Sequence, residues 1–253
     1  YLLILEKQNG FIMNIITTPI IYLILILPLI YFGKKKSNGS KQNIIVFVIY
    51  VILDMYATAL PIEFHYFDFV KLEMNWSGKI YSYILAAAFL LNFKSIPLSQ
   101  FGITTKQKEG SFHFSVWTTV TFLVLMLAYC IFIGRYKANI ENIIFQITMP
   151  CIIEEIVFRG ILLTLLSTVF IDNFKIGKTS FGMGVIITSI LFGLWHGLNI
   201  TNDLELIISW IPFIYTGLIG FVLALIKERT GSLLFPIIIP VSYTHLTLPT
   251  MYT

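Results

Sequence analysis

The sequence predicts an all-α polytopic membrane protein, with about eight transmembrane helices of which the eighth is truncated. The first observation is composition: the 253 residues are 57% hydrophobic and 12% charged, whereas soluble proteins have about 25% charged residues. The second is a mean hydropathy of +0.85. The third is the recurrence of apolar runs that approach the thickness of a bilayer. Together these observations exclude a soluble domain.

The expected helices are the apolar segments between charged residues. They are residues 15–32, 44–62, 80–93, 114–133, 143–171, 181–199 and 206–226, and a last segment that begins at Leu233 and is cut off by Pro240. Pro150 is expected to break the fifth segment early. Strands are disfavoured, because membrane strands alternate apolar and polar side chains and these runs are apolar on every side. We therefore expect a single transmembrane domain over residues 1–253.

Basic residues predict how the helices are oriented, because cytoplasmic loops collect Lys and Arg. Alternate loops are lysine-rich and are expected inside, whereas the other loops carry most of the acids. The inside residues are Lys34, Lys35, Lys36, Lys41, Lys94, Lys106, Lys108, Lys175, Lys178, Lys227 and Arg229. The amino terminus is then outside, and Lys79 belongs to an outside loop. The positive charge reports topology, so no nucleic-acid partner is expected.

Four ionisable residues at membrane depth are the candidate functional residues, since each costs about 2.5–3.5 kcal/mol to insert unless it is paired or hydrated. Glu155 and Arg159 are spaced i,i+4, which permits an ion pair on one helix face. Glu154 points about 100° away and is predicted to be an unpaired base. His196, on the next helix, is expected to find a charged partner on another helix.

Structural roles compete with this hypothesis. A buried Glu155–Arg159 pair can serve packing alone, and a membrane histidine is often a hydrogen-bonded core residue. The combination favours water activation, which needs a base, a second proton-handling group and a stabilising charge. Asp54 is interpreted as a satisfied buried acid or the edge of a cavity, and Trp195 as part of an aromatic belt.

The ordered motifs resemble the CAAX protease and bacteriocin-processing family, also called the Abi family of intramembrane proteases. They are Pro150-x-x-x-Glu154-Glu155-x-x-x-Arg159-Gly160, Phe192-x-x-x-His196 and Arg229-Thr-Gly-Ser-Leu-Leu-Phe-Pro236, within a core of about residues 140–239. The resemblance implies that Glu154 activates water, that Glu155 and Arg159 support it, and that His196 is the first catalytic histidine.

The third motif departs from the family pattern. A histidine is expected at position 240 and an asparagine four residues later, but the sequence has Pro240 and Thr244. Residues 240–253 read like translated sequencing-adapter DNA, and a histidine codon cut after its first base would give proline in that reading. We therefore expect a non-native tail, no catalytic role for His245, and an inactive chain as written.

The leading function is an intramembrane endopeptidase that acts on a peptide or protein substrate within the lipid bilayer, in the cell membrane of a bacterium. The alternatives are a non-catalytic bacteriocin self-immunity protein of the same family and a proton-coupled transporter. No cofactor is assigned. A divalent metal such as zinc stays open, with Glu154 and His196 as candidate ligands, although catalytic zinc takes three protein ligands.

Overall fold

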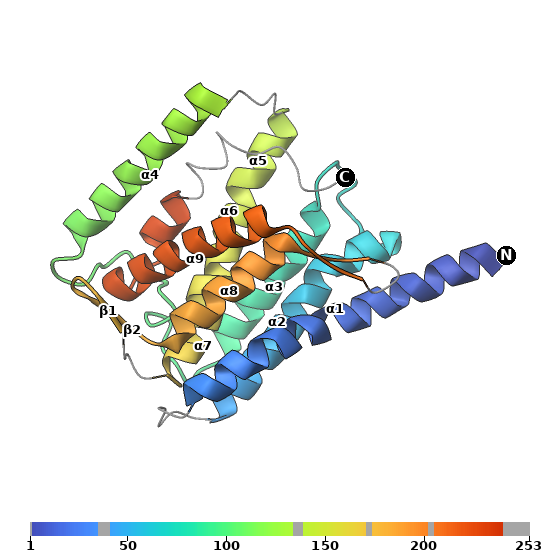
Figure 1. Ribbon diagram of the computed structural model, residues 1–253, viewed down its shortest axis with the longest axis horizontal. Coiled ribbons are helices and arrows are strands. Elements are labelled where there is room, and N and C mark those ends of the chain that lie inside the picture. The colour runs from blue at the N-terminus through green and yellow to red at the C-terminus, as the bar shows by residue number, and fades with distance from the viewer. Residues whose placement is uncertain (1, 35–40, 134–138, 171–173, 202–204, 240–253) are drawn as a thin grey trace.

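The computed structural model describes residues 2–34, 41–133, 139–170, 174–201 and 205–239 (Figure 1). Helices dominate these residues, as predicted. They are α1 (Leu2–Lys34), α2 (Lys41–Glu63), η1 (His65–Phe67), α3 (Trp76–Asn92), α4 (Phe112–Ile133), α5 (Ile140–Thr148), α6 (Pro150–Glu155), the π-helical segment η2 (Ile156–Leu162), α7 (Leu163–Ser167), α8 (Met183–Gly197) and α9 (Trp210–Thr230). Residues 234–239 are also helical.

The segment predicted over residues 143–171 is divided into α5, α6, η2 and α7, and the break expected at Pro150 is present between α5 and α6. Pro150 disfavours helical geometry in the residue before it, and Met149 accordingly has φ −97° and ψ −83°. Pro150 itself occupies the first turn of α6, where its missing N–H costs nothing. The break therefore starts a new helix just before Glu154 and Glu155.

Two short hairpins correct the prediction of a purely helical chain. Strand β1 (Phe174–Ile176) pairs antiparallel with β2 (Thr179–Phe181), and β3 (Leu198–Ile200) pairs with β4 (Leu206–Ile208). The expected helix over residues 206–226 consequently begins later, at Trp210. Leu206 to Ile208 continue the apolar run, so hydropathy alone placed them in the helix.

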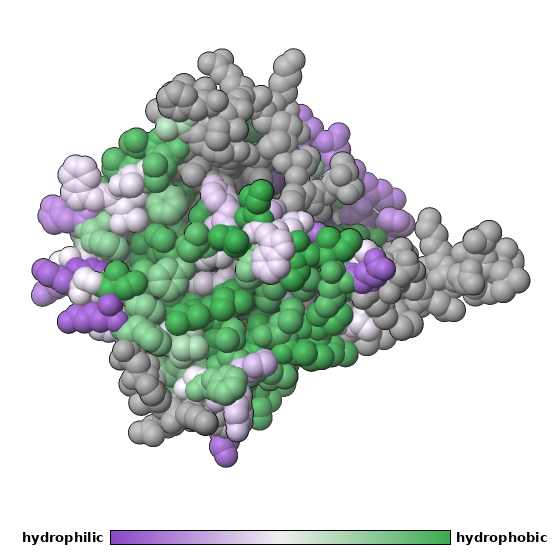
Figure 2. Space-filling model, viewed as in Figure 1, coloured by the Kyte–Doolittle hydropathy of each residue, from purple (hydrophilic) through white to green (hydrophobic). Residues whose placement is uncertain are grey.

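Long apolar helices are present, but the count of eight membrane crossings stays a prediction. In the part of the chain that the structure describes, α2 and α9 are long and apolar enough to cross a bilayer, and shorter apolar stretches occupy residues 17–33, 112–125 and 183–197. Figure 2 shows a broad hydrophobic face. Large apolar side chains such as Ile211, Trp117 and Ile140 are more than two-thirds exposed, which suits contact with lipid chains.

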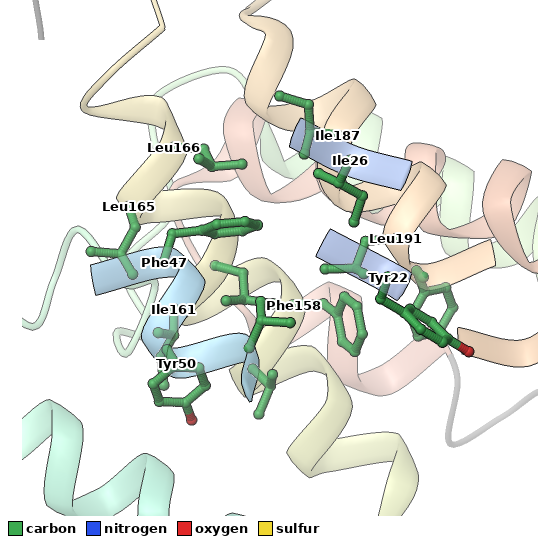
Figure 3. Close-up of a cluster of buried hydrophobic side chains, with 14 of the residues drawn as sticks. Tyr22, Ile26, Phe47, Tyr50, Phe158, Ile161, Leu165, Leu166, Ile187 and Leu191 are labelled. Carbon is green, nitrogen blue, oxygen red and sulfur yellow. The ribbon is translucent and has the colours of Figure 1, made fainter. Parts of the chain in front are cut away.

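The core lies where α1 and α2 meet η2, α7 and α8 (Figure 3). Ile26 of α1, Phe47 of α2, Ile161 of η2 and Leu191 of α8 are fully buried there. Helices α8 and α9 pack closely at Gly193, where a Cβ atom would lie 2.6 Å from the Phe213 carbonyl oxygen. This packing fixes the position of α8, which carries His196, against α9.

Described residues beside the loops predicted to lie inside are joined by hydrogen bonds. Asn43 Nδ2, beside the first loop, donates to Thr168 Oγ1 at 2.7 Å. Thr164 Oγ1 donates to the Gln100 carbonyl at 3.1 Å, and Lys108 N donates to the Thr230 carbonyl at 2.9 Å. These helix ends therefore lie together, and the side of the membrane that they face stays a prediction. Residues 240–253, expected to be a non-native tail, lie outside the described residues.

Candidate active site

Glu154 is held between two basic side chains that come from different helices. Its Oε1 accepts a hydrogen bond from Lys79 Nζ of α3 at 2.7 Å, and its Oε2 lies 3.9 Å from His196 Nε2 of α8. The expectation that His196 finds its charged partner on another helix is confirmed. The expectation that Glu154 is unpaired is wrong, because Lys79 belongs to α3 and not to a loop.

A backbone hydrogen bond determines which nitrogen of His196 faces Glu154. His196 Nδ1 lies 2.9 Å from the carbonyl oxygen of Phe192, one turn earlier in α8. A carbonyl only accepts, so Nδ1 carries the proton. In the neutral imidazole, Nε2 is then an acceptor that faces the carboxylate across 3.9 Å, a gap longer than a direct hydrogen bond. A water molecule can bridge such a gap.

The predicted pair of Glu155 and Arg159 is confirmed, and it is deeply buried. Arg159 Nη1 lies 2.8 Å from Glu155 Oε1, and each side chain is only 2% exposed. The guanidinium also lies 4.1 Å from the centre of the Phe192 ring, a cation–π contact. The Phe192 ring in turn packs 4.5 Å from the His196 ring. The pair therefore supports the residue that holds His196.

Space for Arg159 depends on a glycine of α9. A Cβ atom at Gly220 would lie 3.1 Å from Arg159 Nη2 and 3.1 Å from the Phe192 ring. Glu155 Oε2 and Arg159 Nη2 are buried and have no hydrogen-bond partner among the described residues. The ion pair is thus enclosed tightly, and its remaining polar atoms are unsatisfied within the described part of the chain.

A small cavity adjoins Glu154 and is lined by groups from α2, α3, α6, η2 and α8. It offers about 10 Å³ to the centre of a water molecule, which is enough for one water. Asp54 lines it and accepts a hydrogen bond from Ser82 Oγ at 2.5 Å. Trp195 also lines it, so this side chain belongs to the site and not only to an aromatic belt.

The described residues do not form a zinc site. Catalytic zinc takes three protein ligands, and the described part of the chain has no group of three or more His, Cys, Asp or Glu side chains placed to hold a metal. One oxygen of Glu154 is already bound by Lys79. Glu154 and His196 therefore supply two metal donors within the described residues, fewer than catalytic zinc takes.

Sequence reasoning missed Lys79 and understated Asp54. A lysine one turn inside an apolar helix is itself unusual, and α3 starts at Trp76 because Asn75 caps it by accepting from Gly78 N at 3.0 Å. That cap signal places Lys79 within the helix. Asp54 carries the same signal as Glu154, an acid inside an apolar run. The third motif, at positions 240 and 244, lies outside the described residues.

Comparison with known protein families gives a match over the second half of the chain. Residues 121–244 match the family described as Rce1-like, type II CAAX prenyl endopeptidase Rce1-like. The matched segment contains Glu154, Glu155, Arg159 and His196, whereas Lys79 and Asp54 precede it. No curated protein and no solved structure matches the chain.

Proposed function

Through residues 121–244 the chain belongs to the Rce1-like family of type II CAAX prenyl endopeptidases, and from this membership we propose that it is an intramembrane endopeptidase that uses Glu154 and His196 to activate water. The family is membrane-embedded. The observation that carries the proposal is the 3.9 Å separation of Glu154 Oε2 from His196 Nε2, a gap that one water molecule can bridge. A bacterial cell membrane as the location is part of the proposal and rests on the motif resemblance.

The proposed reaction starts with a water molecule between Glu154 and His196. The carboxylate of Glu154 accepts a proton from the water, and the oxygen attacks the carbonyl carbon of the scissile peptide bond. The unprotonated Nε2 of His196 orients the water by accepting a hydrogen bond from its second O–H, which stays on the attacking oxygen. The proton taken by Glu154 then passes to the leaving amine, so that the carboxylate is regenerated and two peptide fragments are released.

Lys79 has two proposed roles in this scheme. Its ammonium holds one carboxylate oxygen, so that the other is directed towards His196. It is also the nearest cation to the reacting centre, and positive charge stabilises an oxyanion as it develops. Arg159 acts at greater distance, through the Phe192 ring and the carbonyl that fixes the His196 tautomer.

Replacement of Glu154 by Gln tests the proposal. Glu154→Gln keeps the size of the side chain and removes the base, so cleavage is expected to fall by about 10²-fold or more. The assay follows a farnesylated peptide that ends in a CAAX sequence, in nonionic detergent, by mass spectrometry. Glu205→Gln is the matched control, because Glu205 is an exposed acid that lies outside the cavity.

A second arm addresses the third motif, since the chain as written is proposed to be inactive. Pro240→His combined with Thr244→Asn restores the family pattern and is expected to give the cleaving form in which Glu154→Gln is tested. If neither form cleaves the peptide, the peptidase proposal is contradicted for this substrate class. Bacteriocin protection that persists in cells after Glu154→Gln and His196→Ala would instead support the immunity protein.

A further inference from the structure

A second cavity lies beside the ends of α7 and α9 and the segment that precedes α4. It is open to the surface and has a volume of about 470 Å³ between the loop that precedes α4, the end of α7 and the end of α9. None of the residues that line it also lines the cavity beside Glu154. The proposed peptidase reaction therefore gives it no role.

The lining of this cavity is polar and positively charged. Three lysines, Lys106, Lys108 and Lys227, face one glutamate, Glu228, and the other lining residues are mainly hydroxyl and amide side chains. Lys227 lies at the floor and is only 5% exposed, whereas Lys106 and Lys108 are exposed at the rim. A buried ammonium below an exposed basic rim attracts an anion into the cavity.

Glu228, the one carboxylate among the residues that line the cavity, already contacts other lining residues. Lys227 Nζ lies 3.5 Å from Glu228 Oε1, and Ser167 Oγ donates to the same oxygen at 3.1 Å. Lys227 Nζ also donates to Thr164 Oγ1 at 3.0 Å. An ammonium has three N–H donors, so one donor of Lys227 remains after these two contacts. The glutamate thus fixes Lys227 in place without neutralising the cavity.

Two lining groups have no partner within the described part of the chain. Both atoms of the Gln107 amide are buried without a hydrogen bond. The ammonium of Lys106 makes no ion pair or hydrogen bond with the described residues. Buried amides are normally satisfied, so the unpartnered Gln107 is a second, independent sign that a polar ligand completes this cavity.

We propose that this cavity binds a phosphate group, which Lys106, Lys227 and the Gln107 N–H donors recognise. The group has two possible sources, an anionic phospholipid headgroup and free inorganic phosphate. The observations favour the lipid, because the cavity lies at helix ends on the side that the basic loops predict to be cytoplasmic, and basic pockets between membrane helices at that side bind lipid headgroups. Binding does not require peptidase activity.

The test uses the full chain in maltoside detergent and measures the dissociation constants of dioctanoyl phosphatidylglycerol, dioctanoyl phosphatidylcholine and inorganic phosphate by intrinsic fluorescence. Lys106→Gln is expected to raise the dissociation constant of phosphatidylglycerol about five-fold, which is the effect of one basic residue near an anionic lipid. Lys227→Gln is expected to raise it further. Lys175→Gln is the matched control, because Lys175 is an exposed lysine of β1 outside the cavity. Glu154→Gln is expected to bind normally.

Each outcome bears on the proposal. Binding of phosphatidylglycerol alone supports a lipid headgroup site, and binding of inorganic phosphate with equal affinity supports the phosphate site with a soluble source. Equal dissociation constants for phosphatidylcholine and phosphatidylglycerol would overturn the proposal, because the lysines of the cavity would then not recognise the net negative charge of the headgroup. An equal loss in Lys175→Gln and Lys106→Gln also overturns the site, since general surface charge then explains the binding. Lys106 is exposed, so Lys106→Gln is expected to keep the fold, and weaker binding by this variant reports the loss of the charge.

Discussion

Lys79 and Glu154 form the closest ion pair of the proposed active site, at 2.7 Å, with side chains 14% and 17% exposed. Lys79→Met keeps the apolar stem and removes the cation that holds Glu154. We expect the free energy of unfolding to fall by about 1–3 kcal/mol, the usual cost of losing a hydrogen bond to a charged group. Denaturant unfolding in detergent measures the change. Lys71→Met, at an exposed lysine, is the control, and equal losses would argue against the pair.

Arg159 compensates a carboxylate that is 98% buried within α6, so removing it alone should be costly. Arg159→Met leaves Glu155 uncompensated, and we expect a loss of about 3–5 kcal/mol in unfolding free energy. The double variant Glu155→Gln with Arg159→Met removes both charges and is expected to recover most of that loss. The same unfolding measurement compares the two. A double variant as unstable as Arg159→Met would show that burial of charge is not the cause.

At the scale of the elements, the contact of α8 with α9 sets where His196 stands. Gly193 lies three residues before His196 on α8, and its missing side chain lets the Phe213 backbone of α9 approach. Gly217, on α9 at the same interface, has more room, since a Cβ atom there would lie 3.5 Å from the Ser189 carbonyl oxygen. These two glycines therefore provide a matched pair of substitutions.

Gly193→Ala is expected to destabilise the protein by about 1–3 kcal/mol, because the added methyl group overpacks the interface. It should also lower the rate of peptide cleavage, since it moves His196 relative to Glu154. Gly217→Ala is expected to be tolerated, because its methyl group meets ordinary contacts and alanine favours helix. Thermal unfolding reports the change in stability, and cleavage of the farnesylated peptide is measured in the form that also carries Pro240→His and Thr244→Asn. Similar behaviour of the two variants would contradict the packing argument.

At the scale of the whole molecule, the basic loops predict the orientation in the membrane. Lys175 of β1 is expected inside and Glu205, which precedes β4, outside; both side chains are exposed. A membrane-impermeant maleimide added to whole cells should therefore label Glu205→Cys and spare Lys175→Cys, in a chain whose Cys130 and Cys151 are replaced by Ser. In cells permeabilised beforehand both cysteines should be labelled, which controls for the reactivity of each thiol. The reverse pattern would invert the orientation and place the phosphate-binding cavity outside.

The sequence by itself determined the helical class, most of the helical segments, the Glu155–Arg159 pair and the family, which the match over residues 121–244 confirms. Each is local information. A long apolar run in lipid satisfies its backbone hydrogen bonds within one helix. An i,i+4 spacing brings two side chains together in whichever fold contains the helix. Pro150 likewise predicted a break in the fifth segment from its own missing N–H.

Only the tertiary structure decided what surrounds Glu154. Lys79 is 75 residues away along the chain, and its contact depends on how α3 packs against α6, which no periodicity records. The same is true of Asp54 and Ser82, 28 residues apart, and of the second cavity, which three separate segments enclose. Residues Leu206–Ile208 form a strand because they pair with Leu198–Ile200, which is also a tertiary contact. Contacts between distant elements depend on the packing of whole helices, and hydropathy along the chain contains no such information.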